Sequence, residues 1–422
     1  MRPSLALVAY WALGMAVALG DGNLTGLPFA LVAFAVLAYG WGRGARAHAV
    51  GAWMLPVVIA STAAIACGHI SPERSLLGLV VPLTFAQAIV GLMLVVRPRL
   101  AVGPLLAGAI ALYAIAGAIT IVAAPVPYID VLELQQQGAA DLERGRDPYA
   151  MAFPNRYTPE QTRAFFGDDR GELHEYPYPP LSLLATTLSH RLTGDVRWVF
   201  LGAQLGIGAL LFALARGRGG DAPTALGIAT LHFLHPRGLF MLGRGWTDAM
   251  LACALLAVIW LVQSARVRWL GAALGAFIAL KQYSVLALPL LARHGRVPRR
   301  SWIEALLVAT AVTVPFLVWS PPDFVNDVVL FQVRQPFRTD AMSIPAFLFE
   351  LTGWRAPGAV AVVGAAAALA AVWRKSGPDE PWRLPMAAAL VYMAFFLCAK
   401  QAFCNYYYFA GSVILSGAAL GA

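Results

Sequence analysis

The sequence predicts an all-α, polytopic integral membrane protein, and three observations lead to that fold class. Of its 422 residues, 59% are hydrophobic and 13% are charged, whereas soluble globular chains carry about 25% charged residues. Apolar runs of roughly 17–22 residues recur throughout, each long enough to cross a membrane as a helix. Basic residues gather in the short loops between these runs, as the positive-inside rule describes for cytoplasmic loops. We expect one bundle of about 12–14 transmembrane helices.

The spans follow one another with little room between them. Arg2 and the first apolar run could form a signal peptide, but the number of later runs favours an uncleaved first helix. Segment 269–292 is too short for two full spans, so we expect a helical hairpin that turns near Lys281. The other expected spans are 5–20, 27–42, 52–67, 77–96, 104–124, 196–215, 224–242, 248–263, 303–320, 357–373, 384–398 and 403–421.

The charge distribution predicts the orientation. If the arginine-rich loops are cytoplasmic, loop 125–195 faces outward, and so do 18 of the 22 acidic residues. The net charge of +9 is then a topology signal, and we expect no nucleic-acid partner. We expect a multi-pass protein of the plasma (inner) membrane whose active site faces the extracytoplasmic side. The four cysteines lack metal-ligand spacing and predict neither a zinc site nor a disulfide framework.

The chain divides into three parts of one transmembrane domain, residues 1–422. Residues 1–124 form five N-terminal helices with few polar side chains, which we expect to serve packing and lipid contact. Residues 125–195 form a long extracytoplasmic catalytic loop with short helices, one over 131–144 that stops at Gly145. Residues 196–422 supply the remaining helices and the outer loops that bind the donor. Leu181–Leu192 is too short to span and should lie at the interface.

Asp130, directly after an apolar run, has two possible roles. With Glu133 it forms the Asp-x-x-Glu pattern of a capping box for a helix that starts at Val131. A partly desolvated carboxylate at the mouth of a helix bundle is also a good general base. The two roles can coexist.

Two further motifs follow in the same loop. Arg144-Gly145-Arg146-Asp147-Pro148-Tyr149 is typical of a tight helix exit, and its arginines could also face phosphates or acidic partners. His174-Glu175-Tyr176-Pro177-Tyr178-Pro179-Pro180 predicts a rigid, extended segment lined by aromatic side chains. Those aromatics are typical of a membrane-interface belt, and tyrosine faces also stack on sugar rings.

Lysine occurs only at positions 281, 375 and 400. Lys281 lies inside an apolar run, where an unpaired cation costs several kcal/mol. Lys400 lies at the outer end of a span, where snorkelling explains it equally well. The alternative is a phosphate clamp of Lys281 and Lys400, to which Arg244 and either Arg334 or Arg338 contribute, with Arg334 assigned to the site. Asp248 could instead simply pair with Arg244.

The order of these motifs resembles the first extracytoplasmic loop of GT-C glycosyltransferases. It is most similar to glycosyltransferase family 87, the polyprenyl-phosphomannose-dependent α-mannosyltransferases, and more distantly to the first mannosyltransferase of GPI-anchor synthesis. The resemblance is good over 128–181 and loose over 104–421, where Lys281-x-Tyr283 and Asn405-Tyr406-Tyr407 contribute. It implies a GT-C-like bundle and Asp130 as the base that deprotonates the acceptor hydroxyl.

The resemblance also implies the rest of the site and its partners. GPI-type enzymes carry Asp-x-Asp where this chain has Tyr128-Ile129-Asp130, so we expect no cofactor and no metal, apart from a divalent cation at Asp130 and Glu133 as a weaker alternative. The expected partners are a polyprenyl-phosphate sugar donor, a lipid or glycan acceptor, and membrane lipids. The expected sugar- or acceptor-binding residues are Glu133, Arg146, Tyr149, His174, Tyr176, Tyr178, Gln282, Tyr283, Asn405 and Tyr406.

The expected orientation supports a lipid-linked donor independently of the resemblance. Nucleotide sugars are made in the cytoplasm, so a transferase whose site faces outward needs a donor that crosses the membrane in lipid-linked form. A single base opposite a phosphate leaving group implies direct displacement with inversion. Mannose follows from the resemblance alone, and arabinose or glucose is chemically admissible. The alternatives are a transporter or flippase of a polyprenyl-linked or anionic substrate, and a non-catalytic assembly subunit.

Overall fold

The computed structural model describes residues 5–20, 23–43, 54–68, 78–97, 99–123, 129–155, 157–166, 170–217, 219–375 and 380–421. These residues are overwhelmingly helical. Their one sheet pairs the two-residue strands β1 (Phe153–Pro154) and β2 (Glu172–Leu173) antiparallel, with Phe153 opposite Leu173. The predicted all-α class is confirmed.

Most of the predicted apolar spans are helices close to their expected positions. Among the described residues, α6, α10 and α16 are each long and apolar enough to cross a membrane alone, and six shorter apolar helices accompany them. The helices found at the expected spans are α1 (Leu5–Leu19), α2 (Leu27–Arg43), α3 (Met54–Gly68), α5 (Val80–Val96), α6 (Val102–Ala123), α10 (Arg197–Gly217), α13 (Asp248–Gln263), α16 (Arg299–Trp319), α20 (Ala359–Lys375), α21 (Arg383–Leu397) and α22 (Cys404–Leu420).

The expected span over 224–242 is wrong, because the structure divides it. Helix α11 (Ala222–Phe233) ends before Pro236, and α12 (Gly238–Gly243) begins after it. Proline lacks an N–H donor and disfavours helical backbone in the residue before it, so a continuous helix does not form across this point. Helix α12 and α13 then meet at 120°, as one broken span or a re-entrant turn.

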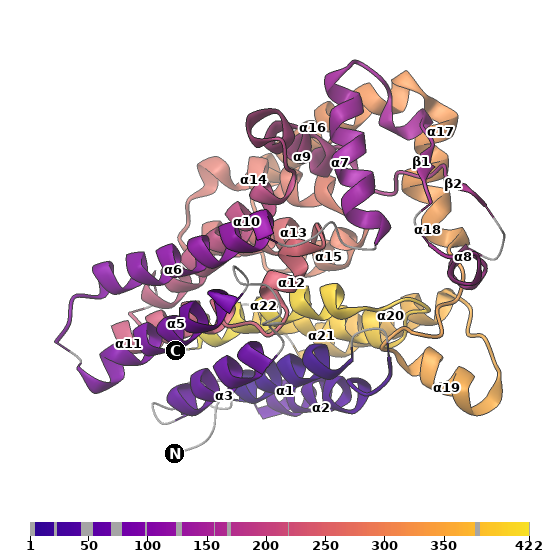
Figure 1. Ribbon diagram of the computed structural model, residues 1–422. Helices are drawn as coiled ribbons and strands as arrows, with labels where there is room; N and C mark the ends of the chain where they lie inside the picture. The colour runs from indigo at the N-terminus through magenta and orange to yellow at the C-terminus, as the bar shows by residue number, and fades with distance from the viewer. Residues whose placement is uncertain are drawn as a thin grey trace.

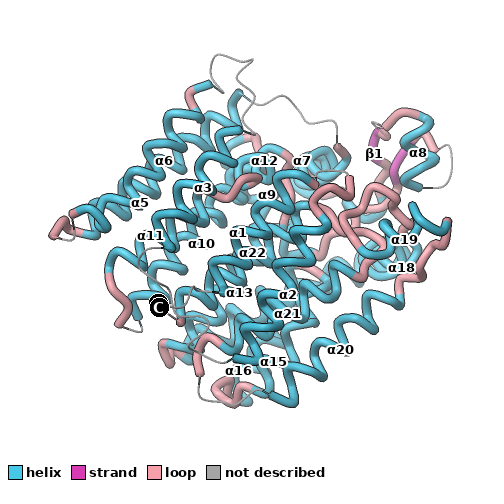
Figure 2. The backbone as a smooth tube through the Cα atoms, turned by 90° about the horizontal axis from the view of Figure 1, so that it is seen from below, coloured by secondary structure: helices cyan, strands magenta, loops and turns pink. Residues whose placement is uncertain are grey.

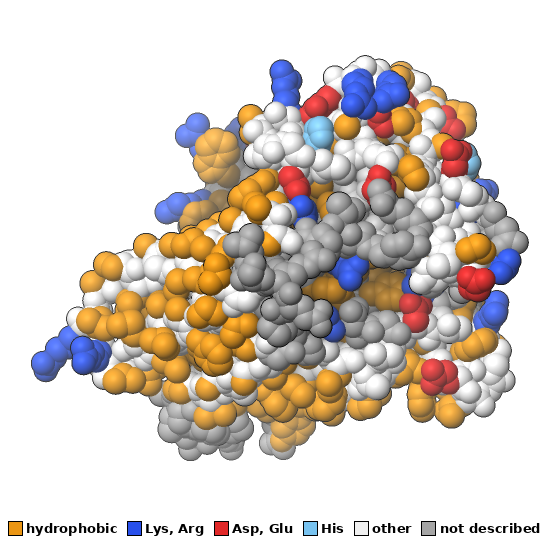
Figure 3. All heavy atoms as spheres, in the orientation of Figure 1, with side chains coloured by type: hydrophobic (Ala, Val, Ile, Leu, Met, Phe, Trp, Pro, Cys, Tyr) orange, Lys and Arg blue, Asp and Glu red, His pale blue; other side chains and the backbone are white. Residues whose placement is uncertain are grey.

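The N-terminal helices divide between core and surface. Helix α1 packs against α2, α3 and α22, and the buried Tyr10 hydroxyl donates to the Leu231 carbonyl at 2.7 Å. Helices α5 and α6 instead expose apolar side chains such as Ile89 and Val122. Hydrophobic side chains cover that side of the surface in Figure 3, with Lys or Arg side chains at its tip, whereas acidic side chains lie mainly toward the opposite end. This distribution suits lipid contact along α5 and α6.

The bundle has two distinct ends. Helices α8 (Pro159–Phe166), α18 (Phe331–Arg334) and α19 (Ile344–Thr352) lie with β1 at one end in both views, and the turn between α5 and α6 lies at the other (Figures 1 and 2). The first end is made of loops that the charge pattern assigns to the outside, so we call it the loop end. The short elements α17 (Pro321–Val325) and the π-helix η5 (Asn326–Leu330) connect α16 to α18 there.

Segment 267–293 forms the predicted helical hairpin. After the short turn η3 (Val267–Trp269), α14 (Leu270–Leu280) runs to Lys281, whose backbone is extended, and η4 (Gln282–Ala287) and α15 (Leu288–Arg293) follow. Lys281 contacts Asp248 at the start of α13, whereas Arg296 contacts Gln263 at its end, at 3.4 Å. The segment therefore travels the length of α13 and returns.

The described residues of the long loop after α6 form four short helices, two of which end at glycines with positive φ. Helix α7 (Asp130–Glu143) ends just before Gly145 (φ 71°), as predicted, and α9 (Pro180–Thr193) ends at Gly194 (φ 78°). Both glycines adopt the left-handed conformation that side chains disfavour. The remaining two helices are η2 (Pro148–Ala150) and α8.

Aromatic side chains form a second, smaller core under this loop. Tyr149 and Tyr176 are buried beside Phe153, Phe316 and Phe324. Their rings meet edge-on, 5.5 Å apart. These contacts join the two tyrosine-proline motifs to α16 and α17, so the loop has its own packed interior.

Candidate functional site

A cavity of about 930 Å³ opens at the loop end of the bundle. Residues from six distant segments meet there, and the wall combines charged groups with a larger apolar area. Its polar and aromatic lining consists of Asp130, Tyr157, Glu175, Tyr178, Phe240, Arg244, Trp246, Thr247, Lys281, Gln282, Tyr283, Phe331, Gln332, Gln335, Arg338, Asp340, Phe395, Lys400, Gln401, Phe403, Asn405 and Tyr406.

Asp130 stands on this wall as the first residue of α7. Ile129 occupies the N-cap position without a side-chain bond, and Glu133 hydrogen-bonds with Gln137. The predicted capping box is therefore wrong, because the helix begins one residue earlier than expected. The Asp130 carboxylate instead takes hydrogen bonds from the backbone N–H groups of Asp130 and Val131.

The surroundings of Asp130 favour its protonated form. Burial raises the pKa of its carboxyl, although a hydrogen bond from Tyr157 and the nearby charge of Arg338 act in the opposite direction. The Tyr157 hydroxyl also accepts a hydrogen bond from the Asp130 backbone N–H at 3.3 Å. A carboxylate with a raised pKa is a stronger base than one in water.

A second carboxylate, Asp248, lies fully buried at the start of α13. It accepts hydrogen bonds from Lys281 Nζ at 2.8 Å, from Asn405 Nδ2 at 2.9 Å and from the Tyr283 hydroxyl. The pairing of Asp248 with Arg244 that the sequence left open is not formed. Asp248 instead joins the hairpin to α22 and gives Lys281 the partner that a cation inside an apolar run requires.

Four cationic side chains line the cavity: Arg244, Lys281, Arg338 and Lys400. Arg338 forms a two-pronged salt bridge with Asp340, and Lys400 donates to the carbonyls of Val333 and Gln335. Burial lowers the pKa of Lys400.

Arg244 differs from the other three cations. It lies over the Phe240 ring, 4.8 Å from the centroid, and has no carboxylate partner within the ranges that the structure describes. It is the cation best placed to bind an anionic ligand.

The structure brings together most, but not all, of the residues that the sequence assigned to the site. Lys281, Lys400, Arg244, Tyr178, Gln282, Tyr283, Asn405 and Tyr406 join Asp130 on the cavity wall. Gln282 also donates to the carbonyls of Pro177 and Val328, so it fixes the YPYPP segment in place.

Six assigned residues do not belong to that wall. Tyr149 and Tyr176 are in the aromatic core, because their rings pack inward and their hydroxyls bond to Tyr178 O and Gln135. Arg146 pairs with Asp141, as a helix exit requires. The others are Glu133, which bonds to Gln137, His174, which is exposed, and Arg334, which lines a separate cavity.

Three residues on or beside the wall had no assigned role in the site. Tyr157 lies 27 residues after Asp130, and nothing in the sequence places it beside that carboxylate. The sequence does contain an indication for Asp248, because an acidic side chain in an otherwise apolar helix needs a charged or hydrogen-bonding partner. Arg338 was the alternative to Arg334, and only the course of the chain after α18 decides between them.

Part of the cavity wall is apolar and reaches the surface of the bundle. Val285, Val333 and Val362 line it and are each more than half exposed, at 55%, 73% and 62%. They come from the hairpin, α18 and α20. The polar part of the cavity therefore continues into an apolar face that lies where lipid is expected.

Metal binding has limited support among these side chains. Within the described residues there is no group of three His, Cys, Asp or Glu side chains that could hold a metal ion. Glu133, the second acid considered for a divalent cation, is engaged with Gln137. The expectation of a metal-independent reaction stays a prediction.

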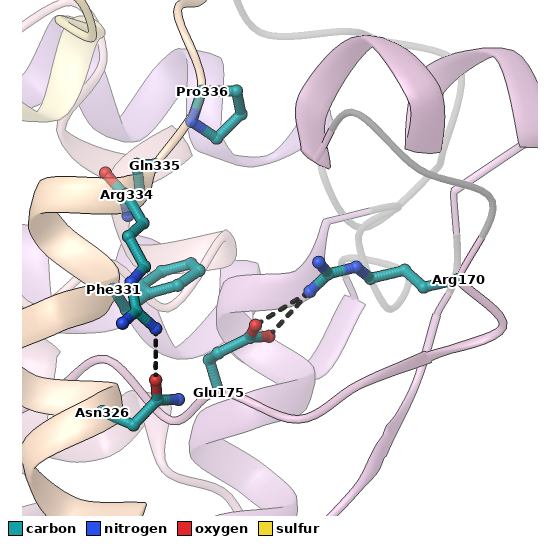
Figure 4. A pocket seen from close by; sticks show the side chains of 7 residues that line it. All are labelled: Arg170, Glu175, Asn326, Phe331, Arg334, Gln335 and Pro336. Carbon is teal, nitrogen blue, oxygen red and sulfur yellow. Dashed lines mark hydrogen bonds and ion pairs between the residues drawn. The ribbon is translucent and has the colours of Figure 1, made fainter.

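A smaller cavity of about 200 Å³ adjoins the first (Figure 4). It is lined by Arg170, Glu175, Asn326, Phe331, Arg334, Gln335 and Pro336. Arg170 forms an ion pair with Glu175 at 2.8 Å, and Arg334 donates to Asn326 Oδ1 at 3.1 Å. Glu175, Phe331, Gln335 and Pro336 line both cavities.

The fold and the large cavity define a class: a multi-pass helical membrane protein with a deep site, basic and acidic at one end and apolar at the other. The model of glycosyltransferase family 87 matches residues 176–399, which is more than half of the chain. The chain belongs to glycosyltransferase family 87. The predicted family is thus confirmed, although the match begins near the end of the 128–181 stretch where the resemblance was strongest.

Two other comparisons complete the picture. The crystal structure of ArnT from Cupriavidus metallidurans bound to undecaprenyl phosphate is similar to this chain, with 17% sequence identity and a TM-score of 0.47. The similarity covers 74% of this chain and 60% of that one, so the chain spans less than two thirds of the length of ArnT. No curated protein matches the sequence.

Proposed function

We propose that the protein transfers a sugar from a polyprenyl-phosphate donor to a hydroxyl of a lipid or glycan acceptor, with Asp130 as the general base. One observation carries the proposal: a single cavity holds a carboxylate with a raised pKa, several cations and an apolar exit to the bundle surface. A donor with a sugar, a phosphate and a long hydrocarbon tail has these three parts in the same order.

Each part of the donor has a matching part of the cavity. The tail fits the apolar face at Val285, Val333 and Val362, where it would replace bundle surface that is otherwise in contact with membrane lipid. Arg244 and Lys281 are suited to hold the phosphate of the sugar donor, because a positively charged N–H group forms a strong hydrogen bond with a phosphate oxygen.

The proposed reaction is one direct displacement. The acceptor oxygen attacks the anomeric carbon, the bond from that carbon to the phosphate oxygen breaks, and the acceptor proton moves to Asp130. Polyprenyl phosphate leaves with the negative charge that Arg244 and Lys281 stabilise, which is where catalytic benefit is largest. A single displacement inverts the configuration at the anomeric carbon.

We further propose that the sugar is mannose and that the loop end faces the outside of the plasma membrane. Mannose is favoured by the resemblance to polyprenyl-phosphomannose-dependent enzymes. The orientation is favoured by the basic loops at the opposite end, which belong on the cytoplasmic side. Membership of a glycosyltransferase family favours transfer over the transporter or flippase alternative.

Asp130→Asn tests the proposal. We expect transfer from radiolabelled polyprenyl-phosphate mannose in membranes to fall by about 10²–10⁴-fold, the contribution of a positioned general base. Glu133→Gln is the matched control: it removes an acid one helical turn away that lines neither cavity, and should leave transfer near the wild-type rate. Undiminished transfer by Asp130→Asn would remove the base assignment, and wild-type protein that consumes no polyprenyl-phosphate sugar would overturn the proposed function.

A further inference from the structure

We propose that the smaller cavity binds an acidic group of the acceptor, a phosphate or a carboxylate, between Arg334 and Arg170. This inference rests on the proposed function and names the class of acceptor that the same site takes. It assigns Arg334 to the acceptor, whereas the sequence alone placed it on the donor phosphate.

The charges around the smaller cavity are unequal. The Arg170 guanidinium donates to both carboxylate oxygens of Glu175. The side chain of Arg334 is exposed, and its hydrogen bond goes to the neutral amide oxygen of Asn326. Among the described residues that line this cavity, two guanidinium groups therefore face one carboxylate (Figure 4). An acidic ligand would restore the balance through charge-assisted hydrogen bonds.

The size of the cavity limits what it can hold. Its volume of about 200 Å³ is below the roughly 300–1,000 Å³ of pockets that enclose a whole drug-sized ligand. It suits one acidic group of a larger molecule. The four residues common to both cavities, among them Glu175 and Gln335, mark the place where the rest of that molecule passes toward Asp130.

The position of Arg334 separates it from the donor site. It does not line the large cavity, in which Arg244 and Lys281 already offer positive charge to the donor phosphate. None of the three valines at the apolar exit, Val285, Val333 and Val362, lines the smaller cavity. A ligand held by Arg334 therefore approaches Asp130 from the side of the loops, as an acceptor must if the donor tail occupies the apolar side.

The experiment measures binding of glucose 6-phosphate to the purified full-length protein in phosphatidylcholine nanodiscs, with glucose as the uncharged control. We expect the wild type to bind glucose 6-phosphate more tightly than glucose. Arg334→Gln should weaken glucose 6-phosphate binding by about tenfold, equivalent to roughly 1.4 kcal/mol. Arg355→Gln, an exposed arginine at the same end that lines neither cavity, should leave binding unchanged.

Two further arms separate the possible failures. If Arg244→Gln weakens binding and Arg334→Gln does not, the phosphate binds in the donor cavity and the inference is overturned; equal binding of glucose and glucose 6-phosphate overturns it as well. Nanodiscs that contain phosphatidylglycerol identify the source of the acidic group: competition with the probe indicates a lipid headgroup, and its absence indicates a soluble or glycan acid. The proposed function itself is tested separately by the transfer assay, in which it fails if the wild-type protein transfers no sugar.

Discussion

Asp130 lies on the cavity wall and Asp248 lies behind it, against three side chains of that wall, and the surroundings of the two carboxylates differ. Asp248 is fully buried and accepts three hydrogen bonds from Lys281, Tyr283 and Asn405. Asp130 is partly exposed on the wall, with Tyr157 and Arg338 nearby, and burial raises its pKa. The same side chain therefore serves two purposes, according to which groups surround it: Asp248 pairs with a cation from the hairpin, whereas Asp130 is bonded by Tyr157 and by the backbone N–H groups of Asp130 and Val131.

The difference between the two carboxylates indicates which of them can act as a base. A carboxylate with all its acceptor capacity engaged holds other groups in place, and a proton transferred to it would break those bonds. Asp248 therefore positions the hairpin and α22, and with them the cavity wall. The hydrogen bonds to Asp130 come from Tyr157 and from the backbone at the start of α7, so a proton on Asp130 disturbs no contact with the hairpin or α22.

The largest expected effect is on folding, from Asp248→Asn. The substitution leaves the Lys281 cation buried without a charged partner, which should cost about 3–5 kcal/mol of stability. Thermal unfolding of the purified protein, followed by tryptophan fluorescence in detergent, measures it. Asp130→Asn is the comparison variant, and it should unfold close to the wild type. If the two variants unfold alike, the distinction between the two carboxylates fails.

A smaller effect should follow from Asp248→Asn combined with Lys281→Met. This double variant removes both charges and keeps an acceptor for Tyr283 and Asn405, so it should recover much of the lost stability, since buried ion pairs are often replaceable by neutral side chains. Transfer should stay low, because the donor phosphate has lost one cation. Recovery of folding together with wild-type affinity for the donor would exclude Lys281 from the phosphate site.

The sequence was a good guide to the helices because membrane spans depend on composition over a whole segment. The apolar runs and the hairpin at Lys281 could be read in this way, whereas the break at Pro236 shows that a single residue can divide a run of suitable length. The division of the N-terminal helices between core and surface could not be read, because α1 and α6 have similarly apolar sequences.

The site was harder to predict, because its members are far apart in the chain. Lys281 could be predicted because a cation in an apolar run is costly unless it is paired. The same reasoning applies to its partner, because an acidic side chain in an apolar helix, such as Asp248, also needs a partner. Tyr157 lies in an ordinary polar loop and gave no such signal. Tyr149 and Tyr176 were assigned to sugar binding since tyrosine suits both a core and a sugar face, and only packing distinguishes the two.

The smallest expected effect concerns Tyr157 and the pH dependence of transfer. The Tyr157 hydroxyl stabilises the ionised form of Asp130 and so holds the pKa of that carboxyl lower than burial alone would place it. Because a general base acts in its deprotonated form, transfer should rise as pH rises through this pKa. Tyr157→Phe raises the pKa further, so the acid limb of the kcat/KM profile should move to higher pH.

At pH values on that acid limb, Tyr157→Phe should transfer roughly fivefold more slowly than the wild type, which corresponds to a net hydrogen bond of about 1 kcal/mol. Above the limb the two proteins should converge, because Asp130 is then ionised in both. Tyr178→Phe is the matched control, since it removes another hydroxyl from the same wall. A uniform loss at every pH would show that Tyr157 only packs against the loop, and that Asp130 resembles Asp248 more closely than the geometry indicates.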